Sequence, residues 1–200
     1  LSRVQSQDNG RGQTWEFFFA GSRTEMVDPL SNSEVSYFNR LGGVTRFIDP
    51  LGNETACEFD GLNRLVEKTF PEGNKVQWTY DLNNNVLTQT SVAKPGSGLS
   101  DIVETFTYDS TWAKMETRED GNGNTTTYTY DGTSGNLLTI ERPVIASVTP
   151  TVTMTWNARG QMLTREDETG VVTKFVYDAT YEKMTSVIVD FNVRGHLNLT

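Results

Sequence analysis

The chain has 200 residues, a net charge of −9 and an apolar content of 36%, which is ordinary for a globular protein. The acidic balance argues against nucleic acid as a general partner, because phosphate binding needs clustered Lys and Arg. No apolar run approaches the roughly 18 residues of a membrane helix, so we expect no membrane insertion.

The chain opens inside a repeating pattern. No charged-then-apolar leader is visible, so the sequence shows no signal peptide. Residues 1–13 look like the second half of a repeat and its turn, and residues 15–19 form the first clear predicted strand. Because the pattern also runs to the other end, we expect residues 1–200 to be one array segment of a longer protein.

Residues 76–90 show the repeat most clearly. Large apolar and polar residues alternate up to Tyr80, an Asp/Asn-rich corner follows, and the alternation resumes. This pattern predicts two antiparallel strands around a turn. Counted from Asp81, the equivalent corner positions lie 21 to 28 residues apart, at Phe18, Asn39, Asp60, Asp109, Asp131, Asn157 and Asp178. We name these eight positions the first-corner residues.

The residue before each first corner is aromatic in all eight repeats, although aromatic residues make up only 10% of the chain. Strand alternation places these aromatics on one face and threonines such as Thr79 and Thr129 on the other. We expect the aromatics to form a buried ladder. They are Phe17, Phe38, Phe59, Tyr80, Tyr108, Tyr130, Trp156 and Tyr177.

A second kind of turn lies midway through each repeat. It is rich in Pro, Gly, Asn and Asp, which favour turns because Pro fixes φ and Gly and Asn accept positive φ. Two corners about ten residues apart leave strands of about six residues, and no helical period persists. The predicted fold class is therefore all-β, with tandem antiparallel β-hairpins in a curved sheet, because so long a sheet has to curl. The second turns occupy residues 28–32, 49–53, 71–74, 120–124 and 167–170.

Two repeats are longer than the others. The additional residues lie at 92–103 and 143–151, and both stretches contain proline. Insertions into a repeat array normally bulge as loops from one edge. A loop that contacts a partner and an insertion that is merely tolerated are both compatible with this pattern.

No candidate side chain predicts catalysis or metal binding. His196 is the single histidine, which excludes a His-rich metal site and weakens any Ser/His/Asp triad. Residues 120–124 resemble the start of an EF-hand loop with Asp131 at the twelfth position. However, Thr125 replaces the sixth-position Gly and strands flank the segment, so a turn is the better interpretation.

The remaining candidates also have structural interpretations. Residues 166–168 read Glu-Asp-Glu and are expected to be a solvated corner rather than paired catalytic carboxylates. Cys57 is the single cysteine, permits no internal disulfide and is expected to be a small buried hydrophobe. We therefore assign no catalytic, cofactor-binding or metal-binding residue.

Residues 49–55, 59–65 and 129–131 read Asp-Pro-Leu-Gly-Asn-Glu-Thr, Phe-Asp-Gly-Leu-Asn-Arg-Leu and Thr-Tyr-Asp. They resemble the YD repeat of Rhs proteins, in which Tyr-Asp is followed by Gly-Arg-Leu, a Gly-containing turn and another aromatic strand. The resemblance covers about residues 14–190. Similar repeats occur in bacterial Rhs polymorphic toxins, in the cocoon-forming components of insecticidal Tc toxins and, more distantly, in animal teneurins.

Several copies depart from that consensus. Asn39 and Asn157 replace Asp, Ser36 replaces an aromatic, and residues 109–115 lack Gly-Arg-Leu. No segment resembles the aspartate-rich self-cleavage site that follows the repeats in the bacterial proteins, and no toxin domain is visible. The family's protease role is therefore not carried onto any residue of this chain.

The resemblance implies a hollow β-shell whose wall encloses a C-terminal toxin domain. The leading hypothesis is a structural encapsulation segment of a secreted or cell-surface bacterial toxin, without catalysis or cofactor. Its expected partners are flanking shell segments and an enclosed toxin domain, with secretion-machinery components as further candidates and edge-to-edge self-association between copies. The alternative is a cell-surface adhesive or glycan-binding module.

Overall fold

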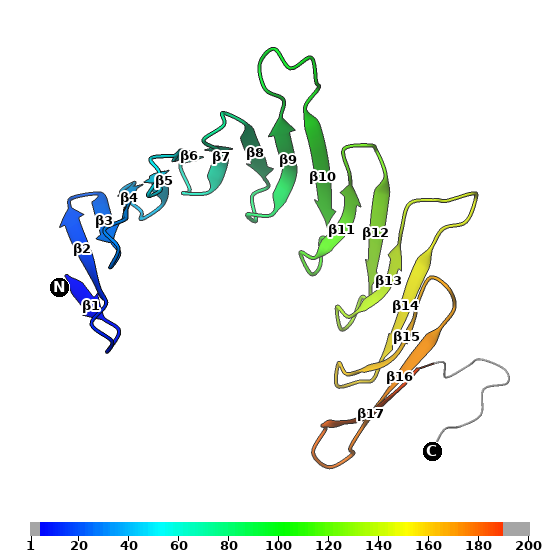
Figure 1. Ribbon diagram of the computed structural model, residues 1–200. Helices are drawn as coiled ribbons and strands as arrows, with labels where there is room; N and C mark the ends of the chain where they lie inside the picture. The colour runs from blue at the N-terminus through cyan, green and yellow to red at the C-terminus, as the bar shows by residue number, and fades with distance from the viewer. Residues whose placement is uncertain (1–4, 190–200) are drawn as a thin grey trace. The chain divides into compact units, whose positions relative to one another are not determined.

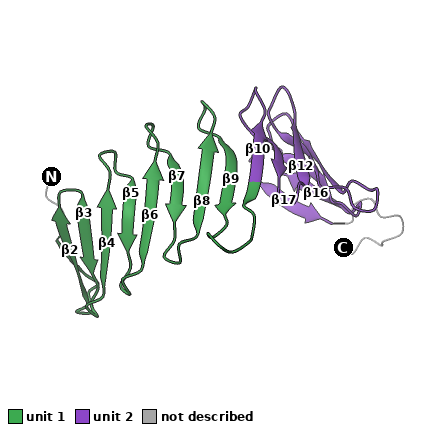
Figure 2. Ribbon diagram, turned by 90° about the horizontal axis from the view of Figure 1, so that it is seen from above, with its two compact units in different colours: residues 1–103 green, residues 104–200 purple. Residues whose placement is uncertain are grey.

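The computed structural model describes residues 5–189, and the regular structure in that range consists of 17 β-strands (Figure 1). The all-β prediction is confirmed. None of the described residues forms a helix of the length and apolar character needed to cross a membrane. The chain divides into two compact units, Leu1–Val103 and Glu104–Thr200, which Figure 2 shows in different colours.

Unit 1 contains nine strands that follow one another along the sheet. Each pairs antiparallel with the next strand in the chain, and Figure 2 shows them side by side. The strands are β1 (Ser6–Asp8), β2 (Thr14–Ala20), β3 (Arg23–Val27), β4 (Ser33–Phe38), β5 (Val44–Ile48), β6 (Glu54–Phe59), β7 (Leu65–Thr69), β8 (Lys75–Tyr80) and β9 (Val86–Val92).

Unit 2 repeats the arrangement, with β10 beginning at the end of unit 1. Consecutive strands again pair antiparallel. The strands are β10 (Ile102–Tyr108), β11 (Met115–Glu119), β12 (Thr125–Tyr130), β13 (Leu137–Glu141), β14 (Thr151–Trp156), β15 (Met162–Glu166), β16 (Val172–Tyr177) and β17 (Met184–Ile188). The two longer connections, residues 93–101 and 142–150, lie where the sequence predicts insertions.

The aromatic residue before a first corner sits at a break in strand pairing. In the β8–β9 hairpin the register shifts between Thr79 and Tyr80, so that Tyr80 faces Val86. The same shift occurs at the equivalent aromatic of six further hairpins. A bulge of this kind bends the strand and increases its twist. Each first corner is therefore entered through a bent strand end.

The first repeat turns at a different residue from the one expected. Phe18 lies inside β2, paired with Glu25, and the pairing continues without a shift to Ala20 and Arg23. The chain reverses at Gly21, which adopts a φ of +61°. Phe18 has no side-chain oxygen with which to close a turn, so the strand extends to the next residue that accepts positive φ.

Strand alternation separates an aromatic face from a threonine face, as the sequence predicts. In β8 the side chains of Trp78 and Tyr80 are half-buried, whereas Thr79 between them is exposed. On the exposed face, opposite threonines share hydroxyl hydrogen bonds of 2.6 to 2.7 Å, a cross-strand pairing that stabilises sheets. The pairs are Thr79 with Thr88, Thr107 with Thr117, Thr129 with Thr139 and Thr155 with Thr164.

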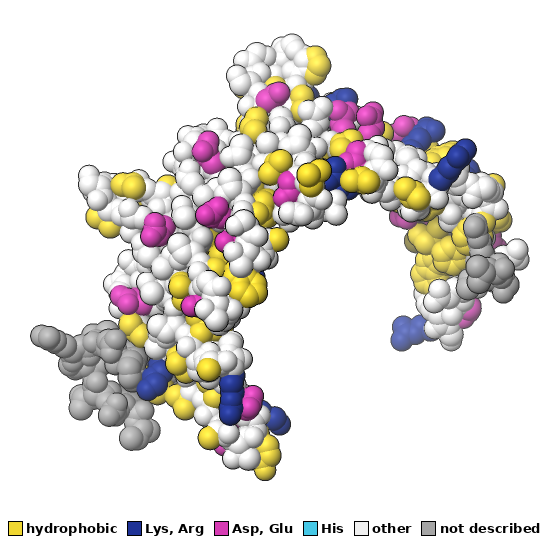
Figure 3. Space-filling view, turned by 180° about the vertical axis from the view of Figure 1, so that it is seen from behind, with side chains coloured by type: hydrophobic (Ala, Val, Ile, Leu, Met, Phe, Trp, Pro, Cys, Tyr) yellow, Lys and Arg dark blue, Asp and Glu magenta, His cyan; other side chains and the backbone are white. Residues whose placement is uncertain are grey.

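The expectation of a buried aromatic ladder is wrong. Among residues 5–189, the buried hydrophobic side chains are Val152, Met154 and Val172, all in unit 2. The aromatics before the first corners are half-buried, and other hydrophobic side chains are visible at the surface (Figure 3). The reason is architectural. Within residues 5–189 each unit is one sheet, so neighbouring strands cover the edges of an aromatic ring but no second layer covers its face.

Candidate functional site

The first corners from Asn39 to Asp178 share one side-chain acceptor in turns of two lengths. The backbone N–H of the first-corner residue donates to the carbonyl four residues on or five residues on; the longer turns start at Asp109, Asp131 and Asp178. In each, Oδ1 of the Asp or Asn accepts two backbone N–H hydrogen bonds from the following residues, at 2.6 to 3.1 Å. At Asp81 the donors are Asn83 and Asn85, both at 2.8 Å. A short side chain that accepts from its own turn explains the restriction to Asp and Asn.

The segment that resembles an EF-hand is a turn of the same kind. Oδ1 of Asp120 accepts the backbone N–H groups of Asn122 and Asn124, and Oδ2 accepts Nδ2 of Asn124 at 3.0 Å. Both carboxylate oxygens are thus engaged by N–H donors. Within residues 5–189, no group of three or more His, Cys, Asp or Glu side chains is placed to hold a metal ion.

The other sequence candidates lie apart from one another. Asp167 closes a second corner by accepting the N–H groups of Thr169 and Val171, and Glu168 forms an ion pair with Arg142. Cys57 is half-buried in β6, where burial raises the pKa of its thiol. His196 lies outside the described residues. The structure does not bring these groups together into one site.

Neighbouring hairpins are joined through the aromatic before each first corner. The Tyr80 hydroxyl donates to the carbonyl oxygen of Leu65 in the preceding hairpin, at 2.6 Å. In unit 2 the Tyr130 hydroxyl donates to the carbonyl of Met115 at 2.7 Å, and Trp156 Nε1 donates to the carbonyl of Leu137, also at 2.7 Å. These bonds hold each ring across the gap between two hairpins.

Two of these rings are each covered by a cationic side chain. The Arg64 guanidinium lies 4.8 Å from the centre of the Tyr80 ring, within cation–π range. Its Nε pairs with Oδ2 of Asp60 at 2.7 Å, and its Nη1 donates to the carbonyl of Asp81 at 2.8 Å. Lys114 takes the corresponding position over Tyr130, with Nζ 5.4 Å from the ring centre. Such a side chain connects one first corner to the next.

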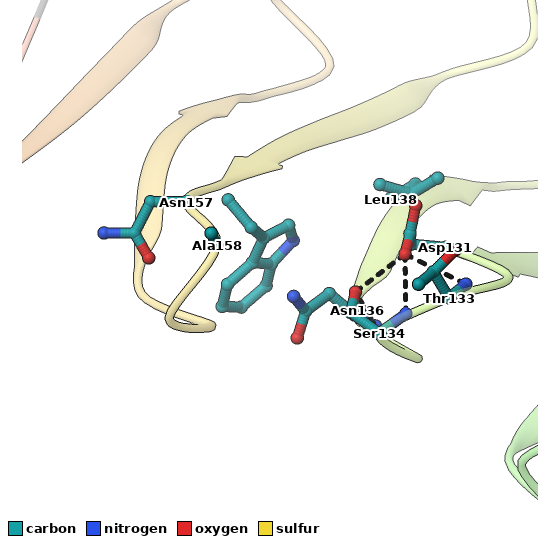
Figure 4. Close-up of a pocket in the computed structure, with 8 residues that line it drawn as sticks. Asp131, Thr133, Ser134, Asn136, Leu138, Asn157 and Ala158 are labelled. Carbon is teal, nitrogen blue, oxygen red and sulfur yellow. Dashed lines mark hydrogen bonds between the residues drawn. The ribbon is translucent and has the colours of Figure 1, made fainter.

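In the step between the first corners at Asp131 and Asn157, a pocket of about 390 Å³ takes the place of such a covering side chain. Its walls include the side chains of Trp156 and Asn136 (Figure 4). Asn136 extends from the β12–β13 corner toward the β14–β15 corner, and Asp131 lies on the far side of it. Of the residues that line the pocket, Asp131 is the charged one. The indole and the carboxylate make this pocket the best-defined candidate site.

The pocket is not recognisable in the sequence alone. The sequence feature that marks it is the residue that ends each first corner. This residue is Arg64 in one repeat, Lys114 in another and Asn136 at the pocket. That difference has no meaning in the linear sequence. It becomes informative only when the fold shows that the long cationic side chains cross to the next hairpin.

Comparison with known proteins places the repeat and the fold. Residues 59–96 match the family described as RHS Repeat. A search of the curated proteins finds no match. Among solved structures, TcdB2-TccC3 without its hypervariable C-terminal region is 13% identical with a TM-score of 0.52, and the alignment covers 92% of this chain and 13% of that one. For TcdB2-TccC3-Cdc42 the identity is 14%, the TM-score 0.51 and the coverage again 92% and 13%.

A third solved structure, the Photorhabdus luminescens Tc holotoxin pore with a mutation in TccC3, is 13% identical with a TM-score of 0.44, covering 94% of this chain and 16% of that one. The chain thus spans 13% of the length of the first solved proteins it matches. The matched repeat lies within a hairpin pattern that recurs along both units, and the fold is shared with TcdB2-TccC3. On this evidence residues 59–96 carry an Rhs repeat, and the fold of the chain is similar to that of TcdB2-TccC3.

Proposed function

We propose that the chain is a segment of the wall of a shell that encloses a toxin domain of the same parent protein. The observation that carries the proposal is the single-sheet construction of each unit. Its aromatic face is half-buried and has no second layer over it among the described residues. A wall needs this form, because one of its faces is turned to the enclosed space. The Rhs repeat and the fold shared with TcdB2-TccC3 support this role.

In this role the segment has no catalysis of its own. The Asp side chains that recur along the chain engage their own turns, as Asp81 and Asp120 do. Further repeats of the parent protein would pair with the outer strands, and the shell would be secreted or displayed at the cell surface. Stability then comes from contacts between neighbouring repeats, as in other repeat arrays.

A protease-protection experiment on the parent protein tests the enclosure. Gly43 is the position at which to weaken the wall, because an added Cβ would meet Phe59 Cζ and Asn39 Nδ2 at 2.9 Å each. The matched control is Gly61→Ala, since a Cβ at Gly61 meets nothing within 4 Å. We expect the enclosed domain to resist digestion in the wild type and in Gly61→Ala but to be cleaved in Gly43→Ala. Cleavage in the wild type at the rate of the free domain would refute enclosure.

A second candidate, an adhesive or glycan-binding module, is favoured by the tips of the two long loops. Leu99 in one loop is 76% exposed, and Ile145 and Val148 in the other are 67% and 64% exposed. Glycan-array and pull-down measurements with the 200-residue chain separate the candidates. Specific micromolar binding that disappears when residues 94–100 are replaced by Asn-Gly would favour the module. Absence of binding would leave the wall as the better account.

A further inference from the structure

The residue that ends a first corner occupies an equivalent place in each repeat, because its carbonyl accepts the N–H of the first-corner residue. The acceptor is Arg64 for Asp60, at 2.9 Å, and Asn136 for Asp131, at 2.8 Å. The other corners of this kind end at Gly43, Asn85, Lys114, Gln161 and Lys183. We name these the corner-ending residues. A long side chain at this place can reach the next first corner, as that of Arg64 reaches the carbonyl of Asp81.

At four of the other corner-ending positions the chain fills or bridges the space before the next hairpin. Arg64 and Lys114 lie over the next aromatic ring. Gln161 donates through Nε2 to the carbonyl of Glu182 at 2.8 Å. At Gly43 the space is occupied by the Phe59 ring, as the 2.9 Å approach to a Cβ shows. In these four repeats a side chain therefore occupies the step from one first corner to the next. The Asn85 side chain instead donates through Nδ2 to Oδ2 of Asp81 in its own corner, at 2.9 Å.

Asn136 closes its step only in part, because its Oδ1 reaches to 3.9 Å from the place that a Cβ on Gly160 would take. Its side chain makes no hydrogen bond with any described residue, and the space before Trp156 is the pocket of about 390 Å³. Asparagine is too short to cover the next ring as Arg64 does. The position of a covering cation is thus left open in front of an indole, the aromatic ring that binds cations best.

Three of the four groups that hold the Arg64 guanidinium have counterparts at this pocket. The fourth, Oδ1 of Asn84 at 3.3 Å, has none, because Gly160 takes the equivalent place. The ring of Trp156 is anchored to the preceding hairpin as that of Tyr80 is, by a bond to the carbonyl of the equivalent residue. The carbonyl of Asn157 accepts the N–H of Gly160, as that of Asp81 accepts the N–H of Asn84. At Asp81 the same oxygen also accepts Arg64. An equivalent acceptor therefore exists at the pocket.

The carboxylate is the third counterpart. Oδ2 of Asp60 binds Arg64 Nε. In Asp131 the turn engages Oδ1, which accepts the backbone N–H of Thr133 and Ser134 and the Ser134 hydroxyl. Oδ2 of Asp131 accepts no hydrogen bond from any described residue. The backbone N–H of Ser134 lowers the pKa of Asp131, which keeps the carboxylate ionised and available to a donor.

We propose that this pocket binds the guanidinium group of an arginine side chain supplied by another polypeptide. The guanidinium would lie on the Trp156 ring, pair with Oδ2 of Asp131 and donate to the carbonyl of Asn157, as Arg64 does within the chain. Arginine suits the site better than lysine, because its planar fork of donors reaches two acceptors while stacking on a ring. The net charge of −9 also attracts a cationic partner. The inference does not depend on the shell role.

The first test titrates the 200-residue chain with N-acetyl-arginine-N-methylamide and follows the Trp156 indole N–H signal by NMR. The chain has 4 Trp residues, so the signal is assigned by its loss in Trp156→Phe. We expect saturable binding that is at least about tenfold tighter than that of the citrulline analogue, which has the same shape without charge. Equal shifts with both compounds, or equal affinity for the lysine analogue, would overturn the guanidinium assignment.

Two substitutions test the geometry. Asn136→Arg supplies the missing cation from within the chain, so we expect it to lower affinity for the arginine analogue at least about tenfold. Asp131→Asn removes the carboxylate charge but keeps the turn acceptor, since Asn39 and Asn157 close corners of this kind. It should lower affinity by a similar factor. The matched control is Asp178→Asn, which should bind as the wild type does.

Wild-type affinity in both Asn136→Arg and Asp131→Asn would show that the ligand binds elsewhere and would overturn the proposal. If either variant fails to fold, the comparison of the arginine and citrulline analogues on the wild type still decides the question. That comparison needs no substitution in the site.

Discussion

At the scale of the residue, every Asp or Asn first corner is closed in the same way, by one side-chain oxygen that accepts backbone N–H groups of its own turn. Asp81 and Asn157 both use Oδ1 to accept two backbone N–H groups of their own turns. Because charge is not required for that contact, both residue types occur. The geometry needs an acceptor one carbon beyond Cβ, and longer or apolar side chains do not supply it.

Removal of that oxygen should be measurable. Asn157→Ala leaves the N–H groups of Arg159 and Gln161 without their acceptor, so we expect a loss of about 1 kcal/mol in the free energy of unfolding. Asn157→Asp keeps Oδ1 but loses the Nδ2 donation to Gln161 Oε1, so it should cost about 0.5 kcal/mol, less than Asn157→Ala. Urea unfolding of the three proteins gives the comparison. Equal stability of all three would contradict the role assigned to the side chain.

Acid should destabilise the corners. The Asn124 side chain and backbone N–H groups hold the pKa of Asp120 below its ordinary value, and the backbone N–H of Arg64 does so for Asp60. A carboxyl whose pKa is lowered by folding contributes stability above its ordinary pKa of about 3.9 and loses it as the pH falls through the lowered value. We expect the thermal midpoint to be level down to about pH 5 and to fall below about pH 4. A level midpoint from pH 5 to pH 3 would count against this account.

At the scale of the element, each hairpin is tied to the one before it by an aromatic side chain. The Tyr80 hydroxyl crosses from β8 to the first residue of β7, Leu65. Trp156 makes the same kind of bond from β14 to Leu137 in β13. The ring therefore contributes a directional contact between repeats in addition to its apolar area.

Tyr80→Phe isolates that directional contact. It removes the 2.6 Å hydrogen bond to Leu65 but keeps the ring, so the expected cost is about 1 kcal/mol in the free energy of unfolding. Tyr177→Phe is the control, because the Tyr177 hydroxyl has no hydrogen bond among the described residues, and its cost should be below about 0.5 kcal/mol. Calorimetry or urea unfolding measures both. Equal effects would mean that the hydroxyl bond does not join the hairpins.

At the scale of the whole molecule, stability in each unit comes from neighbours along one sheet rather than from a central core. In a repeat array of this kind, the backbone N–H and C=O groups on the outer side of each edge strand have no strand to pair with. In residues 5–189, β17 pairs with β16 on one side. Its Met184 and Val187 are 52% and 50% exposed. An exposed apolar edge strand is a template for another chain.

We therefore expect the 200-residue chain to self-associate with increasing concentration, and Val187→Lys in β17 to reduce the association. A charged side chain on an edge strand opposes pairing with a second copy. Light scattering over a concentration series measures the effect, with Thr133→Lys, in a corner, as a control for the added charge. A monodisperse monomer at all concentrations would show that the β17 edge does not drive association.

Much of the fold follows from local chemistry, which is why the strands and most corners were predictable. The alternation in residues 76–80 predicts both the strand and its two faces. The Asp81 corner is predictable from the sequence, because the hydrogen-bond acceptor and its donors lie within five residues of each other. Phe18 shows the limit of such counting. It has the right phase but no turn-closing oxygen, and the chain runs on to Gly21.

The sequence by itself therefore determined the strand pattern, the face assignment and the corner chemistry, because these depend on residues a few positions apart. The tertiary structure decided how deeply the aromatics are buried, since that depends on whether a second layer exists. It also decided that Arg64 covers Tyr80 whereas Asn136 leaves Trp156 uncovered. Those pairs lie 16 and 20 residues apart, and only the pairing of successive hairpins brings their members together.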